Sequence, residues 1–107
     1  TSFDYNAVSD SPAGAGRDTI VNFFVGEADR HEQIDLIDID ANALVAGNQA
    51  FAWIGSNPFT AAGQLRYNTT TGILQGSTDG DTAAELEIQL LGAPALVVGG
   101  ADTHILL

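Results

Sequence analysis

The stretch E-L-E-I-Q-L at residues 85–90 decides the fold class. Leu86, Ile88 and Leu90 are apolar and alternate with Glu or Gln. Residues two apart in an extended chain point to the same side, so this pattern places three apolar side chains on one face and polar ones on the other. The stretch therefore predicts a β-strand with one buried and one solvated face.

Short apolar runs separated by Gly, Asn, Asp and Ser continue on both sides of this strand. The nearest are residues 64–68 and 73–75, which flank turn-forming residues 69–72 and predict a hairpin. Further strands are expected at residues 3–5, 19–25, 34–40, 50–54 and 105–107. The spacing of about ten residues, with no alternating helices and no internal repeat, is typical of antiparallel sheets. We expect an all-β, antiparallel β-sandwich-like domain with short helical turns at most.

Composition excludes several classes of partner and site. The 107 residues suit one domain spanning 1–107, and the absence of Met indicates a fragment of a longer protein. A net charge of −11 argues against nucleic acid and anionic membrane surfaces as partners. No apolar run approaches the roughly 20 residues of a membrane span, so we expect no membrane insertion. Without Cys, the chain has no disulfide, thiolate zinc site or Cys nucleophile.

No catalytic motif is complete. H-E-Q-I-D at residues 31–35 begins like the zinc motif H-E-x-x-H, but Asp35 stands where the second His is needed, and His104 is the one other His. There is no G-x-S-x-G elbow to position a serine nucleophile. We therefore expect no enzymatic activity in this chain.

Two acidic loops are candidate calcium sites. Asp79, Asp81 and Glu85 follow the two- and four-residue spacing with which oxygen ligands surround a hard cation, although an ordinary hairpin loop is the alternative. Asp10 and Asp18 flank a glycine-rich loop whose carbonyls could add ligands.

Two other patterns have competing explanations. The run I-D-L-I-D-I-D at residues 34–40 could be an acidic cation-binding ladder, but a strand with one wet face explains it more simply. The aromatic residues could form a sugar-stacking platform, or they could pack in the core, which we favour. They are Phe51, Trp53, Phe59 and Tyr67.

Taken in order, four segments resemble the C-terminal domain of serralysin-type RTX exoproteins, and the resemblance spans almost the whole chain. The segments are SDSPAGAGRDTIVNF, GEADRHEQIDLIDIDAN, GNQAFAWIGSNPFTAAGQLRYN and GSTDGDTAAELEIQLLG. The resemblance implies a secreted, extracellular, non-catalytic module that closes an upstream parallel β-roll and is recognised by type I secretion machinery. The calcium-binding GGxGxDxUx repeats of such a roll are absent here, so the roll itself would lie upstream.

The resemblance also assigns roles to individual residues. It matches Asp18 to the acid before the last strand of the roll, and the loop of Asp79, Asp81 and Glu85 to the family's acidic loop, with Ser77 and Thr82 replacing an Asp and a Gly. The family's export signature, an acid followed by apolar residues, corresponds to Asp102, Ile105, Leu106 and Leu107. The alternative function is an extracellular carbohydrate- or protein-binding adhesion module.

Overall fold

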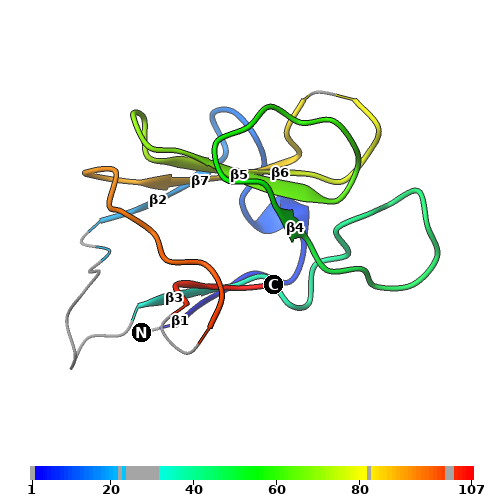
Figure 1. Cartoon of the computed structure of the whole chain (residues 1–107), viewed down its shortest axis with the longest axis horizontal. Coiled ribbons are helices and arrows are strands. Elements are labelled where there is room, and N and C mark those ends of the chain that lie inside the picture. Colours follow the sequence, from blue (N-terminus) through cyan, green and yellow to red (C-terminus); the bar gives the residue numbers. More distant parts are fainter. Residues whose placement is uncertain (1, 22, 24–31, 82, 101–102) are drawn as a thin grey trace.

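The computed structural model describes residues 2–21, 23, 32–81, 83–100 and 103–107, and within them the chain is all-β (Figure 1). One short 3-10 turn, η1 (Val8–Asp10), accompanies two sheets of short strands. The strands are β1 (Ser2–Asp4), β2 (Asp18–Ile20), β3 (Gln33–Asp35), β4 (Ala52–Trp53), β5 (Gln64–Asn68), β6 (Ile73–Ser77), β7 (Leu86–Leu90) and β8 (Ile105–Leu106).

The larger sheet has the strand order β2-β7-β6-β5-β4. Its centre is antiparallel: β5 pairs with β6 as the predicted hairpin, and β6 pairs with β7. Both edge strands pair in parallel with their neighbours, β2 with β7 and β4 with β5. In β7 the alternation expected from the sequence is present, with Leu86, Ile88 and Leu90 all fully buried.

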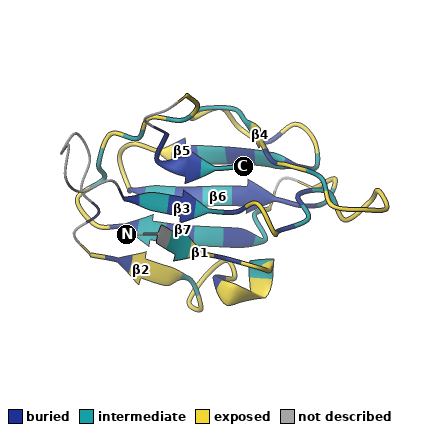
Figure 2. Ribbon diagram, turned by 90° about the horizontal axis from the view of Figure 1, so that it is seen from below, coloured by how far each residue is buried: buried dark blue, intermediate teal, exposed yellow. Residues whose placement is uncertain are grey.

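The smaller sheet has the order β1-β3-β8, and both of its pairings are parallel. It lies against one face of the larger sheet, as the two views in Figures 1 and 2 agree. The largest buried side chains come from both layers, Ile34 and Ile105 from the small sheet and Leu65, Leu74 and Ile88 from the large one. The apolar faces of the two sheets thus form one hydrophobic core.

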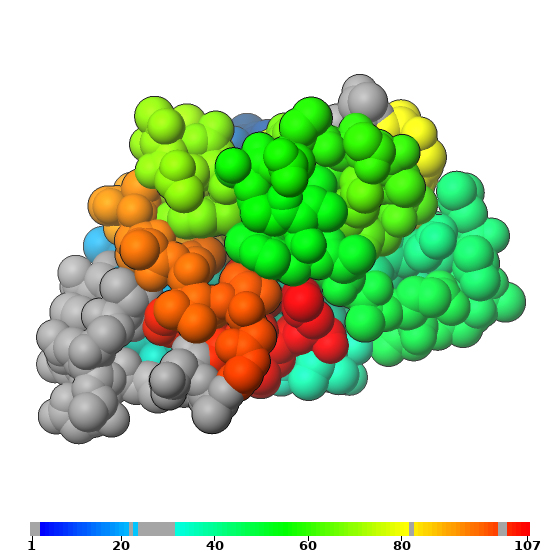
Figure 3. All heavy atoms as spheres, viewed as in Figure 1, coloured from blue at the N-terminus to red at the C-terminus, as the bar shows by residue number. Residues whose placement is uncertain are grey.

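The segment that follows β7 covers one side of this core. Figure 3 shows residues 91–100 (orange) against the C-terminal residues (red). The Val97 N–H donates to Nδ1 of His104 at 2.9 Å, and the His104 N–H donates to the Val97 carbonyl at 2.7 Å. The Tyr67 hydroxyl donates to the Pro94 carbonyl at 2.8 Å, which attaches the segment to β5.

Three sequence predictions need correction. The larger sheet is mixed and the smaller one parallel, not antiparallel as expected, since four of the six strand pairings among described residues are parallel. The strand expected at 34–40 ends at Asp35, whose Oδ1 accepts the Ile37 N–H and turns the chain, leaving Ile37 half exposed. The strand expected at 19–25 is not largely buried in its described part, because Val21 is 62% exposed. Residues 22, 24 and 25 lie outside the described residues.

No helix in the described ranges has both the length and the apolar character needed to cross a bilayer.

Candidate metal centre

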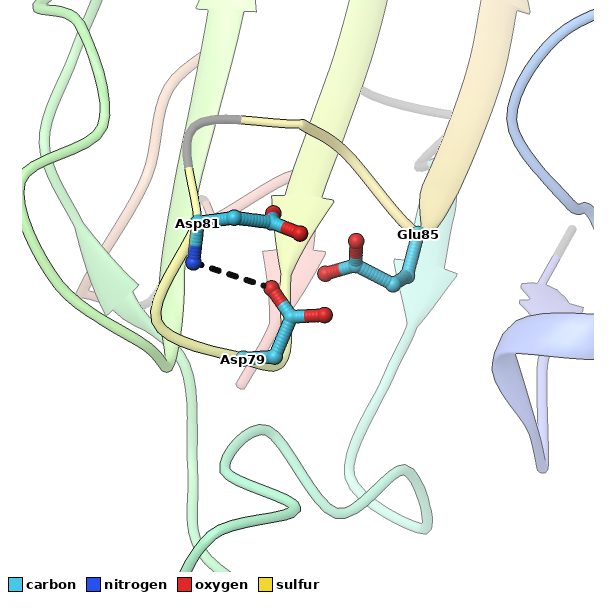
Figure 4. A group of neighbouring side chains, drawn as sticks. All are labelled: Asp79, Asp81 and Glu85. Atoms are coloured by element: carbon cyan, nitrogen blue, oxygen red, sulfur yellow. Dashed lines mark hydrogen bonds between the residues drawn. The ribbon is translucent and has the colours of Figure 1, made fainter.

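Three carboxylates converge in the loop that joins β6 to β7. Figure 4 shows Asp79, Asp81 and Glu85 pointing toward one common space. One carboxylate oxygen of each lies within 4.8 Å of the others. Calcium takes oxygen ligands at about 2.3–2.6 Å, so two ligands on opposite sides of the ion are roughly 5 Å apart. The spacing is therefore compatible with three oxygens on one cation.

The backbone of the hairpin holds these residues in place. The Glu85 N–H donates to the Gly76 carbonyl at 2.9 Å, which closes the loop at the start of β7. Oε1 of Glu85 accepts the Thr78 N–H at 2.7 Å, so this carboxylate is fixed across the loop. The Asp81 N–H donates to Oδ1 of Asp79 at 3.2 Å, and the Ala83 N–H donates to Oδ1 of Asp81 at 3.0 Å. These short-range bonds explain why a loop with Asp at every second position folds into a tight turn.

Ser77, which departs from the serralysin-type pattern that the sequence resembles, has a structural role. Its side chain is fully buried, and its hydroxyl lies 3.3 Å from the Asp79 carbonyl, to which it donates. Thr82, the other departure from the family pattern, lies outside the described residues. The site thus has three carboxylates, and no fourth joins them among the described residues.

One carboxylate of the loop, Asp81, has a pKa that its neighbour shifts. Asp79 raises the pKa of Asp81, through a side-chain hydrogen bond and through its negative charge, and the hydrogen bond from Ala83 only partly opposes this. A cation bound beside Asp81 would offset the charge of Asp79 and so favour the ionised form of Asp81. The donor set contains oxygen only, which suits a hard cation better than zinc.

Asp10 and Asp18, the second predicted calcium pair, each take part in a hydrogen bond within their loop. Oδ2 of Asp10 accepts the Asn6 N–H at 2.9 Å and the Ala7 N–H at 3.3 Å. Oδ2 of Asp18 accepts the Tyr5 hydroxyl at 3.2 Å. Neither carboxylate belongs to a cluster of three ligand side chains within the described part of the chain. Calcium binding by this pair stays a prediction.

Three of the four residues assigned to export are described, and they lie in or directly after β8, an edge strand of the small sheet. Ile105 and Leu106 form β8, and Ile105 is 2% exposed where it pairs with Ile34. Leu107 packs half-buried against the core. Asp102 lies outside the described residues.

The aromatic residues mostly serve the core, as predicted. Phe51, Phe59 and Tyr67 are buried, so they cannot form an exposed stacking platform. Trp53 differs, because it is half-buried and borders a surface hollow of about 300 Å³ together with Leu96.

Sequence reasoning did not single out Arg66. This residue lines a second hollow, of about 320 Å³, next to the first. Its neighbours there come from three separate segments, so no local motif marks the site.

Comparison with known proteins adds no relative: no family model matches the chain, and no curated protein is significantly similar to it.

Proposed function

We propose that this chain is a non-catalytic C-terminal module of a secreted, calcium-dependent exoprotein, that it closes an upstream β-roll, and that it carries a type I export signal. The observation that carries the proposal is the convergence of Asp79, Asp81 and Glu85, which we assign to calcium. The resemblance of the sequence to serralysin-type C-terminal domains supplies the biological context.

The layout of the small sheet supports a role in closing a β-roll. A roll of this kind consists of parallel strands, and β1, at one edge of the small sheet, pairs in parallel with β3. A preceding parallel strand could pair with the outer side of β1 and extend the same sheet. We propose that the last turns of the roll dock there.

The position of the export residues supports a link between calcium and secretion. Ile105 is buried in the folded domain, so a receptor that recognises its side chain must meet the chain before it folds. A chain with a net charge of −11 repels itself when cations are scarce, and calcium outside the cell would favour compaction. The high negative charge would then account both for export of the unfolded chain and for its folding outside the cell.

Calcium titration of the 107-residue chain tests the metal assignment. Three carboxylates on a surface loop suggest a dissociation constant of about 0.1–1 mM, typical of extracellular modules. At about 10 mM calcium this gives roughly 1.4–2.7 kcal/mol of stabilisation, or a rise in Tm of roughly 5–15 °C. Isothermal calorimetry and thermal unfolding followed by circular dichroism measure both quantities.

The double variant Asp79→Asn, Asp81→Asn should lose the calcium response. The control is Asp38→Asn, which removes one negative charge at an exposed position outside the cluster and should respond like the parent chain. An unchanged response in the double variant, or no calcium binding by the parent chain, would refute the metal assignment.

The burial of most of the candidate aromatic side chains limits the alternative function, an adhesion module. Of the four aromatic residues considered for a sugar platform, only Trp53 is partly exposed to solvent. Acrylamide should therefore quench its fluorescence to an intermediate degree, between that of a free indole and that of a core tryptophan. These four residues therefore cannot form a platform of several stacked aromatics.

A further inference from the structure

Two adjoining hollows lie beside the end of β5. The first, of about 320 Å³, is lined by polar groups, among them Arg66, Asn68 and Thr70. The second, of about 300 Å³, has an apolar lining that includes Trp53 and Leu96. The two share Ser56, Tyr67 and Thr69, so they adjoin along one boundary. Each is of the size in which proteins bind small organic groups.

Arg66 is held in a fixed orientation in the polar hollow. Its Nε donates to Oε1 of Gln75 at 2.8 Å, and Nε2 of Gln75 donates to Oε2 of Glu87 at 2.6 Å. Its guanidinium carbon lies 4.6 Å from the centre of the Phe59 ring, and this stacking restricts the plane of the guanidinium group. The side chain has therefore already lost much of the freedom that binding an anion would remove.

The terminal nitrogens of this guanidinium have no protein partner within the described residues. The chain has 14 acidic residues and only three arginines, so an arginine without a carboxylate is unexpected. Arg17 illustrates the usual arrangement, with its Nη1 3.3 Å from Oε1 of Glu87. Arg66 instead lines the hollow, and a guanidinium with two unpaired Nη groups can bind both oxygens of a carboxylate.

The remaining groups in the hollows suit the rest of a sugar ring. Oδ1 of Asn68 accepts the N–H groups of Thr70 and Thr71, at 2.9 and 3.1 Å. Its amide nitrogen is left as a donor, and Thr69 and Thr70, which also line the hollow, are exposed residues with hydroxyl groups. The neighbouring hollow is lined by the half-buried Trp53, and an indole ring can pack against the apolar face of a pyranose.

We propose that the two hollows bind an acidic saccharide. The carboxylate of a uronate unit pairs with Arg66, its hydroxyls bond to Asn68, Thr69 and Thr70, and the adjacent sugar unit packs on Trp53. This site is distinct from the acidic loop and needs no metal. Because the net charge of −11 opposes an anion at long range, binding comes from contacts inside the hollows.

Titration with a digalacturonate tests the proposal, with the neutral digalactose as the matched ligand. Experiments in about 150 mM NaCl with EGTA screen long-range charge and remove any calcium bridge. We expect saturable binding of digalacturonate, seen by calorimetry and as a change in Trp53 fluorescence. Digalactose should bind about tenfold more weakly or worse, because a charge-assisted bidentate contact is absent.

Arg66→Gln should reduce the affinity for digalacturonate by about tenfold or more. Arg66→Lys should lose less affinity than Arg66→Gln but still bind more weakly than the parent chain, since Lys keeps the charge but cannot make the bidentate contact. Arg17→Gln, which removes the same charge elsewhere, should bind like the parent chain. Circular dichroism establishes that each variant is folded. Equal affinity for the acidic and neutral disaccharides, no effect of Arg66→Gln, or equally tight binding of inorganic phosphate would each overturn the proposal.

Discussion

Glu87 shows how one residue joins three segments of the fold. Its Oε1 accepts the Gly14 N–H at 2.9 Å and Nη1 of Arg17 at 3.3 Å, and its Oε2 accepts Nε2 of Gln75 at 2.6 Å. The backbone of the same residue is bonded to buried Ser11, whose hydroxyl donates to the Glu87 carbonyl. The loop between β1 and β2 is thus fastened to the middle of β7.

Glu87 should make the stability of the domain depend on pH in the acid range. Burial alone raises the pKa of Glu87, but the hydrogen bonds from Gly14 and Gln75 and the charge of Arg17 lower it below its usual value. A lowered folded-state pKa contributes stability that is present above the unfolded value of about 4.3 and is lost as pH falls through the folded pKa. Denaturant unfolding from pH 7 to pH 3 should therefore show a loss of stability that begins near pH 5.

The variant Glu87→Gln removes this titration. The Gln amide also places an N–H donor opposite at least one of the three groups that donate to Glu87. We therefore expect a loss of about 1–2 kcal/mol in the free energy of unfolding at pH 7, and a stability that depends less on pH below pH 5. Asp4→Asn is the control, because Asp4 is an exposed acid on β1, and its profile should match that of the parent chain. A Glu87→Gln profile as steep as the parent's would show that other acids carry the pH dependence.

At the scale of elements, the hairpin of β5 and β6 is closed by a loop that only glycine can end. Gly72 has φ +74°, and its N–H donates to the Asn68 carbonyl at 2.8 Å. A Cβ at this position would collide with the Leu90 carbonyl and lie 3.1 Å from Cα of Ala93. The turn and the end of β7 are in direct backbone contact, since the Leu90 N–H donates to the Gly72 carbonyl at 2.7 Å.

Gly72→Ala should therefore destabilise the domain more than a Gly→Ala change at a position that has a left-handed backbone but no steric overlap. Gly92 provides that comparison, because it has φ +85° and a Cβ added there would meet no atom within 4 Å. Gly92→Ala should cost about 1–2 kcal/mol for the left-handed backbone, and Gly72→Ala should cost roughly 1–3 kcal/mol more because of the steric overlap. Urea unfolding of both variants measures the difference, and equal costs would contradict the close packing at Gly72.

The elements that the sequence predicted well are those built from neighbouring residues. The hairpin and β7 were recognisable because turn residues and alternation are local signals. The parallel pairings were missed, since alternation identifies the buried face of a strand but not its partner, and β2 pairs with a strand about 70 residues away. Residues 34–40 were predicted to be a short strand with one wet face, whereas the carboxylates of Asp35 and Asp40 accept N–H groups of turns.

The same distinction applies to the sites. The spacing of Asp79, Asp81 and Glu85 predicts their convergence because all three belong to one loop. The Arg66 hollow was missed because it combines Ser56, residues 66–70 and Gln75, whose proximity depends on the pairing of β5 with β6 and on the loop after β4. Contacts made through tertiary structure leave no spacing pattern in the sequence.

The whole molecule is small and carries a large net negative charge. The net charge is −11, the radius of gyration is 12.9 Å, and the described residues contain one ion pair between side chains. Repulsion among these carboxylates is stronger in the folded chain than in the expanded unfolded one, because the folded charges are closer together. Monovalent salt should therefore stabilise the fold without binding to any site.

The range of that effect follows from the size of the molecule. The Debye length falls from about 30 Å at 0.01 M salt to about 10 Å at 0.1 M, and the molecule measures 39 × 26 × 23 Å. Repulsion across most of the domain is thus only weakly screened at the lower concentration and mostly screened at the higher one. Thermal unfolding should show Tm rising by at least about 3 °C over this range and then levelling off.

Sodium and choline chloride should act equally, because screening depends on ionic strength and not on the identity of the cation. The Asp79→Asn, Asp81→Asn variant should keep this salt response while losing the calcium response, since the first arises from all the carboxylates and the second from one loop. If sodium stabilised the parent chain but choline did not, the monovalent effect would be specific binding, and the acidity of the chain would not act as a general property of the fold.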